Sequence, residues 1–166
     1  MRCSIRLDEL LAPVRDDPSE AAHAKLDMRA VLDEIQTLVT FAAALARYFW
    51  PAQKPYKARG AYLRDKFGLD DTSPLANKEL RNALEHYDER LDDYLKVGMF
   101  GFMIVDYVGL APGQDEVPAH IMRAYYTDTT RFVVLNKEFE IRELHDEVLR
   151  LYVRLKEMDR NGAVFR

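Results

Sequence analysis

Cysteine is almost absent from this sequence, since Cys3 is the only one among 166 residues. A single cysteine cannot form an internal disulfide bond and cannot build a cysteine-type zinc site, so small domains stabilised in either way are excluded. Low cysteine use also fits a reducing compartment. We therefore expect a fold that depends on an apolar core.

Long apolar runs are also missing. The most apolar stretch, residues 97–105, is much shorter than the roughly 20 residues that cross a bilayer, and Asp106 follows it directly. Residues 1–15 mix basic and acidic side chains among their apolar positions, which is unlike a secretory signal. We expect a cytoplasmic protein that does not associate with membranes.

Motifs of the common enzyme classes are absent as well. There is no glycine-rich phosphate loop, no nucleophile elbow and no HExxH pattern. His23 and Asp27 are one helical turn apart, but two ligands do not make a metal site, and a surface hydrogen bond is the simpler interpretation. We expect neither a metal nor a cofactor.

The composition is that of an ordinary folded domain, with 48% hydrophobic and 31% charged residues. A chain of 166 residues is typical of one domain, so we predict a single domain over residues 1–166. The formal net charge of −4 gives no overall attraction for nucleic acids or anionic membranes. Binding to either would need a local basic patch.

A long amphipathic helix is predicted in the first third of the chain. Asp17-Pro18-Ser19-Glu20 has the sequence of a helix start with Asp17 as the cap, whereas Pro13 should end or distort a short helical piece before it. The long helix should stop at Trp50-Pro51. Its apolar residues recur at intervals of three and four and form one face: Met28, Val31, Leu32, Ile35, Leu38, Val39, Ala42, Leu45, Ala46 and Phe49.

A second long helix should begin near Thr72 or Ser73 and reach about Lys96. At about 100° per residue its apolar side chains form one stripe. This predicted core face consists of Leu80, Leu84, Tyr87, Leu91, Tyr94 and Leu95. Asn82 and His86 point away from it.

The last third of the chain has a different pattern. β-Branched and aromatic residues cluster in residues 100–105 and 125–135, as in a pleated sheet. Asn136-Lys137 resembles the turn of a hairpin between two short strands. A loop rich in glycine and proline is expected over residues 109–118.

A last helix is predicted over residues 143–160, with Leu144, Val148, Leu151, Tyr152 and Leu155 on one face. We therefore predict a mainly α fold of the α+β class. It comprises an antiparallel helical bundle over residues 17–98, a strand-rich segment over residues 99–142 with a small β-hairpin or short antiparallel sheet, and the closing helix.

Residues 51–66 are locally basic, with two tyrosines, Tyr56 and Tyr62, interleaved among the cations. A solvated segment between helices is one interpretation, because charge runs usually face water. Phosphate contact is the other, because basic side chains neutralise a phosphate backbone and aromatic rings stack on bases. The candidate nucleic-acid-binding residues are Lys54, Lys57 and Arg59.

One stretch, Arg81-Asn82-Ala83-Leu84-Glu85-His86, combines a helix pattern with a chemical pattern. An arginine, a polar residue directly after it and a histidine five positions on resemble the motif of the HEPN superfamily. The resemblance implies a homodimer in which two motif helices face each other and form a metal-independent ribonuclease site. It also implies that Arg81 stabilises charge on the phosphate, that His86 transfers protons and that Asn82 orients His86.

The implied chemistry suits these residue types, since histidine exchanges protons near neutral pH and arginine holds a phosphate. On a straight helix, however, Arg81 and His86 lie about 140° apart, so both could act on one phosphate only across a two-fold axis. The same helix is acidic, and residues 54–59 would have to fold over the site to offset that charge. The acidic residues are Glu85, Asp88, Glu89, Asp92 and Asp93.

Two hypotheses follow. The first is a dimeric ribonuclease of a toxin or defence system, with RNA as substrate and an antitoxin or a nucleotidyltransferase-like protein as partner. The second is a non-catalytic helical module for dimerisation or protein interaction, in which residues 81–86 are a solvated face with local pairs. Asn82 after the arginine favours the first, and the acidic surround favours the second.

Overall fold

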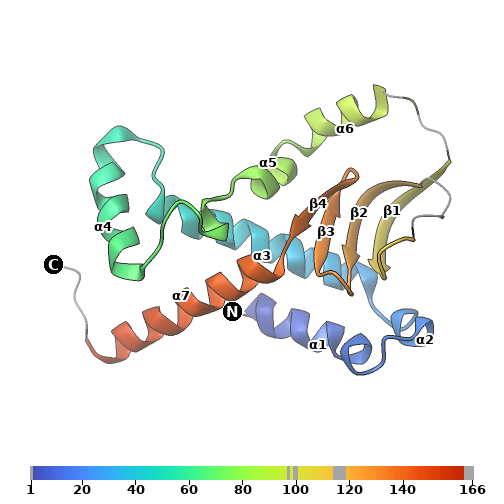
Figure 1. The fold of residues 1–166 in the computed structure, drawn as a ribbon, viewed down its shortest axis with the longest axis horizontal. Helices are drawn as coiled ribbons and strands as arrows, with labels where there is room; N and C mark the ends of the chain where they lie inside the picture. Colours follow the sequence, from blue (N-terminus) through green and yellow to red (C-terminus); the bar gives the residue numbers. More distant parts are fainter. Residues whose placement is uncertain (1, 97, 99–100, 114–118, 163–166) are drawn as a thin grey trace.

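A computed structural model gives the fold of the protein (Figure 1). It describes residues 2–96, 98, 101–113 and 119–162, without the side chains of residues 2–4 and 81. This part of the chain is mainly helical with a four-stranded sheet and a C-terminal helix, which confirms the α+β class. No helix within it is long and apolar enough to span a bilayer.

The helices are α1 (Arg2–Asp16), α2 (Glu20–His23), α3 (Met28–Phe49), α4 (Lys57–Phe67), α5 (Glu79–Glu85), α6 (Tyr87–Lys96) and α7 (Arg142–Arg160). Two short 3-10 helices are η1 (Lys54–Tyr56) and η2 (Pro74–Ala76). The strands are β1 (Phe102–Gly109), β2 (Ala119–Tyr126), β3 (Arg131–Val134) and β4 (Lys137–Glu140).

The central helix is α3, and most of its predicted apolar face is buried: Val31, Leu32, Ile35, Leu38, Val39, Ala42 and Phe49. It packs on α1 on one side and on β1 and β2 on the other. A helix covered on two sides needs a wide apolar arc. The core therefore lies between helices and a sheet, which differs from the predicted antiparallel bundle.

The long helix predicted from Asp17 is divided into α2 and α3. Ser19 rather than Asp17 caps α2, because its Oγ accepts a hydrogen bond from the N–H of Ala22 at 3.3 Å. Asp27 then caps α3 by accepting from the N–H of Ala30 at 3.0 Å. Each cap satisfies an amide that a helix start leaves free, so the second cap marks where the long helix begins.

Pro13 does not end α1, which was one of the two effects predicted for it. The helix continues through it to Asp16, and the N–H of Asp17 donates to the carbonyl oxygen of Pro13 at 3.3 Å. A proline inside a helix removes one hydrogen bond and its ring crowds the carbonyl group four residues earlier, so packing must offset this cost. Leu7 and Val14 are buried on either side of it, and this packing holds the helix against the core.

The hairpin predicted near Asn136 is confirmed as β3 and β4. Its turn is Leu135-Asn136 rather than Asn136-Lys137, because Lys137 pairs with Val134 across the ladder. Both turn residues have positive φ, 50° and 60°, as a two-residue type I′ turn requires. The helix predicted to follow is also confirmed, since α7 runs from Arg142 to Arg160.

The sheet has the order β1-β2-β3-β4 and is mixed rather than antiparallel. β2 pairs antiparallel with β3, but β1 pairs parallel with β2, with Phe102 opposite Ala119 and Gly109 opposite Tyr126. Phe100, predicted as part of the first strand, lies outside the described residues.

The helix predicted to reach Lys96 without a break is interrupted at His86. α5 ends before this residue and α6 begins after it, and the backbone of His86 (φ −115°, ψ 39°) is outside the helical region. Leu80 and Ala83 bury α5 in the core, whereas α6 has no buried residue. Beyond His86, α6 therefore contacts the core only through partly buried residues such as Tyr87.

Candidate functional site

The motif residues lie around the junction of α5 and α6. Arg81 is in α5, and its side chain lies outside the described part of the structure. Asn82 is half-buried, and its carbonyl oxygen accepts a hydrogen bond from the N–H of His86 at 3.1 Å. The His86 side chain is 55% exposed, with Nδ1 3.6 Å from Oε2 of Glu89.

The break at His86 changes the geometry expected from a straight helix. His86 follows the last turn of α5, so the angle of about 140° between Arg81 and His86 along one helix no longer applies. Acids surround the junction, since Glu89 contacts His86 and Glu85 pairs with Arg47 of α3 at 3.1 Å. This charge opposes a phosphate next to His86 within one chain.

The basic segment forms a surface of its own on η1 and α4. Tyr56 is 49% exposed and the Arg59 guanidinium lies 5.3 Å from its ring centre, while Tyr62 is 40% exposed with Lys66 Nζ at 5.5 Å. Lys54 and Lys57 are exposed beside them. We call these six residues the basic surface: Lys54, Tyr56, Lys57, Arg59, Tyr62 and Lys66.

The inner side of α4 is held tightly, which fixes the orientation of the basic surface. A Cβ on Gly60 would lie 2.5 Å from Cδ of Pro51, so the helix packs closely against the end of α3. Arg64 Nη1 donates to the carbonyl oxygen of Phe49 at 2.6 Å. From α7, Arg150 Nη1 donates to the carbonyl oxygen of Phe67 at 3.1 Å.

The basic surface and His86 lie apart within one chain. Figure 1 shows α4 at one end of the molecule, whereas α5 and α6 extend over the sheet toward the other end. The predicted arrangement, in which residues 54–59 fold over the motif helix, is therefore not formed in one chain. Lys54, Lys57 and Arg59 stay together, but they do not join Asn82 and His86 in a single site.

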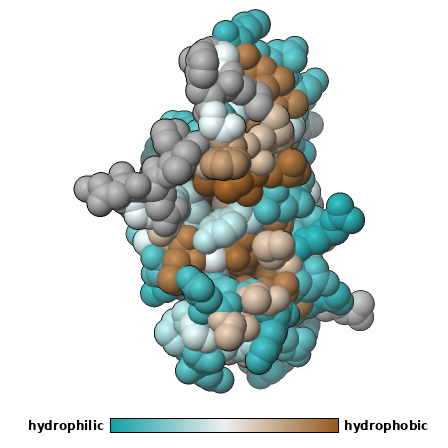
Figure 2. All heavy atoms as spheres, turned by 90° about the vertical axis from the view of Figure 1, so that its right-hand side faces the viewer, coloured by the Kyte–Doolittle hydropathy of each residue, from teal (hydrophilic) through white to brown (hydrophobic). Residues whose placement is uncertain are grey.

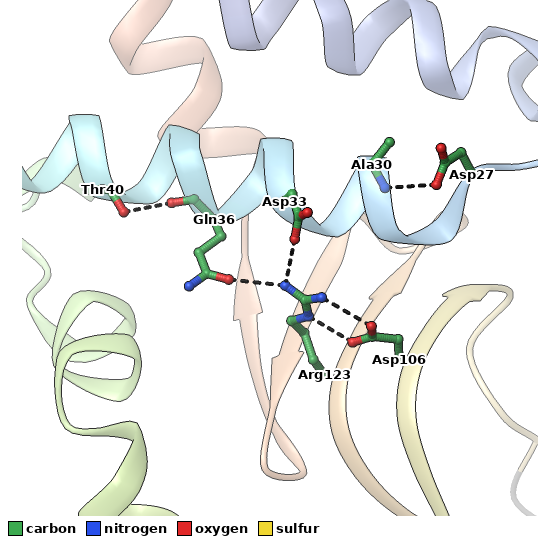
Figure 3. Close-up of polar contacts among 7 residues, drawn as sticks. All are labelled: Asp27, Ala30, Asp33, Gln36, Thr40, Asp106 and Arg123. Carbon is green, nitrogen blue, oxygen red and sulfur yellow. Dashed lines mark hydrogen bonds and ion pairs between the residues drawn. The ribbon is translucent and has the colours of Figure 1, made fainter.

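A polar cluster that the sequence did not reveal ties α3 to the sheet (Figure 3). Arg123 of β2 donates from Nε and Nη2 to the two carboxylate oxygens of Asp106 in β1, at 2.9 and 3.1 Å. Its Nη1 donates to Asp33 at 3.0 Å and to Gln36 at 3.1 Å. All three guanidinium nitrogens are engaged, so the cluster joins elements and does not offer Arg123 to a ligand.

An exposed apolar surface lies on β1 and α6. β1 is an edge strand, and its Phe102, Met103 and Val105 are 66%, 47% and 59% exposed. Leu95 of α6 is 39% exposed. Figure 2, which looks at the side of the molecule carrying these elements, shows hydrophobic residues gathered there. We call these four residues the β1–α6 surface.

The remaining candidates have structural partners. His23 bonds through Nδ1 to the carbonyl oxygen of Ser19 and through Nε2 to Oγ1 of Thr127 at 2.8 Å, while Asp27 caps α3. Their proximity therefore reflects helix capping and a tertiary contact. Within the described part of the chain, no group of three or more histidine, cysteine or acidic side chains is placed to hold a metal.

Comparison of the chain with protein-family models, with curated proteins and with solved structures gives no match. The resemblance to the HEPN superfamily therefore stays a prediction.

Proposed function

We propose that the protein binds single-stranded RNA through the basic surface. The observation that supports this is the combination of four cations with two exposed tyrosines on one outward-facing segment. Cations neutralise phosphates, and tyrosine rings stack on unpaired bases. The contacts of Arg59 with Tyr56 and of Lys66 with Tyr62 place charge and ring side by side, as a backbone and its bases require.

The four cations of the basic surface lie close together on η1 and α4. Several exposed cations elsewhere pair with carboxylates, as Arg47 does with Glu85 and Lys137 with Glu79. Within the described residues, none of the four cations of the basic surface forms an ion pair with a carboxylate. Their positive potential is therefore available to a polyanion although the protein has a net charge of −4.

Fluorescence anisotropy with a labelled single-stranded RNA of mixed sequence tests this proposal. If all four cations contact phosphates, the logarithm of the affinity should fall with the logarithm of salt concentration with a slope of about −3. Reversing two charges, Lys57→Glu with Arg59→Glu, should weaken binding at least about tenfold. Lys25→Glu is the matched control, because Lys25 is exposed and far along the chain from α4.

Equal RNA affinities of the double variant and of Lys25→Glu would contradict RNA binding through the basic surface. Replacing Tyr56 and Tyr62 by leucine separates stacking from charge. This change should weaken RNA binding and leave the salt slope unchanged, because no cation is lost.

A second candidate function rests on the β1–α6 surface and on His86. An exposed edge strand with apolar side chains is a natural pairing surface, and two copies can pair antiparallel about a two-fold axis. Because α6 follows His86 directly, such a homodimer would bring two α5–α6 junctions toward each other. A metal-independent ribonuclease of the HEPN type would then use the exposed His86, with Glu89 as its carboxylate partner.

A non-catalytic dimerisation or protein-interaction module would use the same surface without chemistry at His86. Purified protein and His86→Ala should be compared for RNA cleavage in EDTA. Cleavage that disappears in His86→Ala supports the ribonuclease, whereas equal background in both leaves only the non-catalytic module. If light scattering shows a monomer at all concentrations, both the dimeric ribonuclease and the dimerisation module are contradicted.

A further inference from the structure

A cavity of about 430 Å³ lies between α1, the end of β2 and the start of α7. Leu7, Leu11 and Val14 of α1 form an apolar wall, and Tyr125 and Arg142 bring polar groups from the other side. Its volume is within the range of about 300–1,000 Å³ that is typical of small-molecule sites. An apolar wall with a few converging polar groups is the usual composition of such a site.

Tyr125 is a buried residue that lines this cavity, and its hydroxyl is a polar group available there. The residue is only 5% exposed, and its hydroxyl makes no hydrogen bond with any described residue. Yet no fully buried side-chain nitrogen or oxygen in the described part lacks a partner. The hydroxyl must therefore reach the cavity that Tyr125 lines, where it can bond to a molecule bound there.

The protonation of Tyr125 makes it a donor. Burial raises the pKa of Tyr125 to about 12, although the nearby Arg142 acts in the opposite direction. At neutral pH the hydroxyl keeps its proton, so it suits a ligand with a hydrogen-bond acceptor.

The guanidinium of Arg142 is the group at the cavity that favours an anionic acceptor. Arg142 is exposed and forms no ion pair with the described residues. Three acids also line the cavity, but each has a partner: Asp8 pairs with Arg15 at 3.1 Å, Asp128 accepts from the N–H of Ala111 at 3.0 Å, and Asp146 lies 3.4 Å from His145. The N-terminus of α7 is engaged by Glu140, whose Oε1 accepts from the N–H of Arg142 at 3.0 Å, so the Arg142 side chain is the cationic group that remains for a ligand.

We propose that this cavity binds a small molecule with an apolar body and one carboxylate group. The body lies against Leu7, Leu11 and Val14, and the carboxylate accepts from the Tyr125 hydroxyl and pairs with Arg142. This site is separate from the basic surface and from His86, so it does not depend on either proposed function.

Titration of isotope-labelled protein with octanoate, followed by backbone amide shifts, tests the proposal. Saturable shifts should centre on Tyr125, Ile141 and Arg142. Octylamine has the same apolar chain with the opposite charge and should bind at least about tenfold more weakly. Tyr125→Phe should weaken octanoate binding about tenfold, because it removes one hydrogen bond to a charged group and keeps the ring.

Tyr126→Phe is the matched control. It removes a hydroxyl from the neighbouring residue, which is 4% exposed and belongs to a separate apolar cluster with Ala124 and Val133. Its octanoate affinity should equal that of the wild type. Leu11→Trp fills the cavity and should abolish the shifts. If this variant does not fold, the comparison of Tyr125→Phe with Tyr126→Phe tests the proposal.

Three results would each overturn the proposal: shifts that centre on β1 and α6 or do not saturate, octylamine binding as tight as octanoate binding, and equal octanoate affinities of Tyr125→Phe and wild type.

Discussion

Arg123 and Asp106 form a bidentate ion pair across the only parallel pair of strands among the described residues, with contacts of 2.9 and 3.1 Å and side chains only 21% and 27% exposed. Because Arg123 also bonds to Asp33 of α3, it fixes β1 and β2 against the central helix.

Replacing Arg123 by alanine should lower the free energy of unfolding by about 2 kcal/mol, since it leaves a half-buried carboxylate without its partner. Arg131→Ala is the control. Its partner is Glu138, and both side chains are about half exposed, at 48% and 45%, so the loss should be about 0.5 kcal/mol. Urea denaturation measures both values, and equal losses would contradict the structural role of Arg123.

Acid should destabilise the protein partly through Glu147. The pKa of Glu147 is lowered, chiefly by its hydrogen bond from Arg150, and its side chain is 15% exposed. A carboxyl whose pKa is lower in the native state stabilises the fold above the unfolded-state pKa, and this contribution is lost as the pH falls through the native pKa. Glu147→Gln should therefore lower the melting temperature at pH 7 and flatten its decline below about pH 4.

Glu157→Gln, at an exposed position of the same helix, serves as the control for Glu147. Its melting temperature should follow the wild-type curve over the whole pH range. A decline as steep in Glu147→Gln as in the wild type would show that other carboxyl groups account for the acid effect.

Gly60→Ala should weaken RNA binding, although Gly60 lies on the inner side of α4 and is not part of the basic surface. The added Cβ would lie 2.5 Å from Cδ of Pro51 and 2.6 Å from the carbonyl oxygen of Phe49. Relief of this clash requires α4 to move away from α3, at a cost of about 1–3 kcal/mol in unfolding free energy. RNA affinity should fall together with stability, whereas Ala61→Ser, at an exposed position of α4, should change neither.

Val105→Lys should prevent self-association, because a charge in the middle of an edge strand opposes pairing with a second strand. Val105 is 59% exposed, so the monomer should keep its melting temperature. Val153→Lys on α7, at a site that is 51% exposed, is the control. Light scattering over a range of concentrations should show a dimer for the control and a monomer for Val105→Lys, and a dimer in both would place the interface elsewhere.

The elements that the sequence predicted well are those set by neighbouring residues. α7 follows from its own apolar periodicity, and the β3–β4 hairpin follows from a local turn. The break at His86 is different, because it depends on α5 being buried through Leu80 and Ala83 while α6 is not. Periodicity is the same on both sides of such a break, so it predicted one helix.

Long-range relationships account for the rest of what the sequence did not show. The parallel pairing of β1 with β2 is a contact between two strands, and the composition of either strand does not encode its direction. The cavity beside Tyr125 combines three segments distant in sequence, and no local pattern encodes it.

The position of α3 has a consequence for synthesis of the chain. Asp33 and Arg123 are 90 residues apart, so α3 leaves the ribosome well before β2 exists to cover its second side. α1 can pack on the first side at once, because it precedes α3 in the chain. The sheet-facing side of α3 stays uncovered until the second half of the chain emerges, so an incomplete chain exposes surface that the folded protein buries.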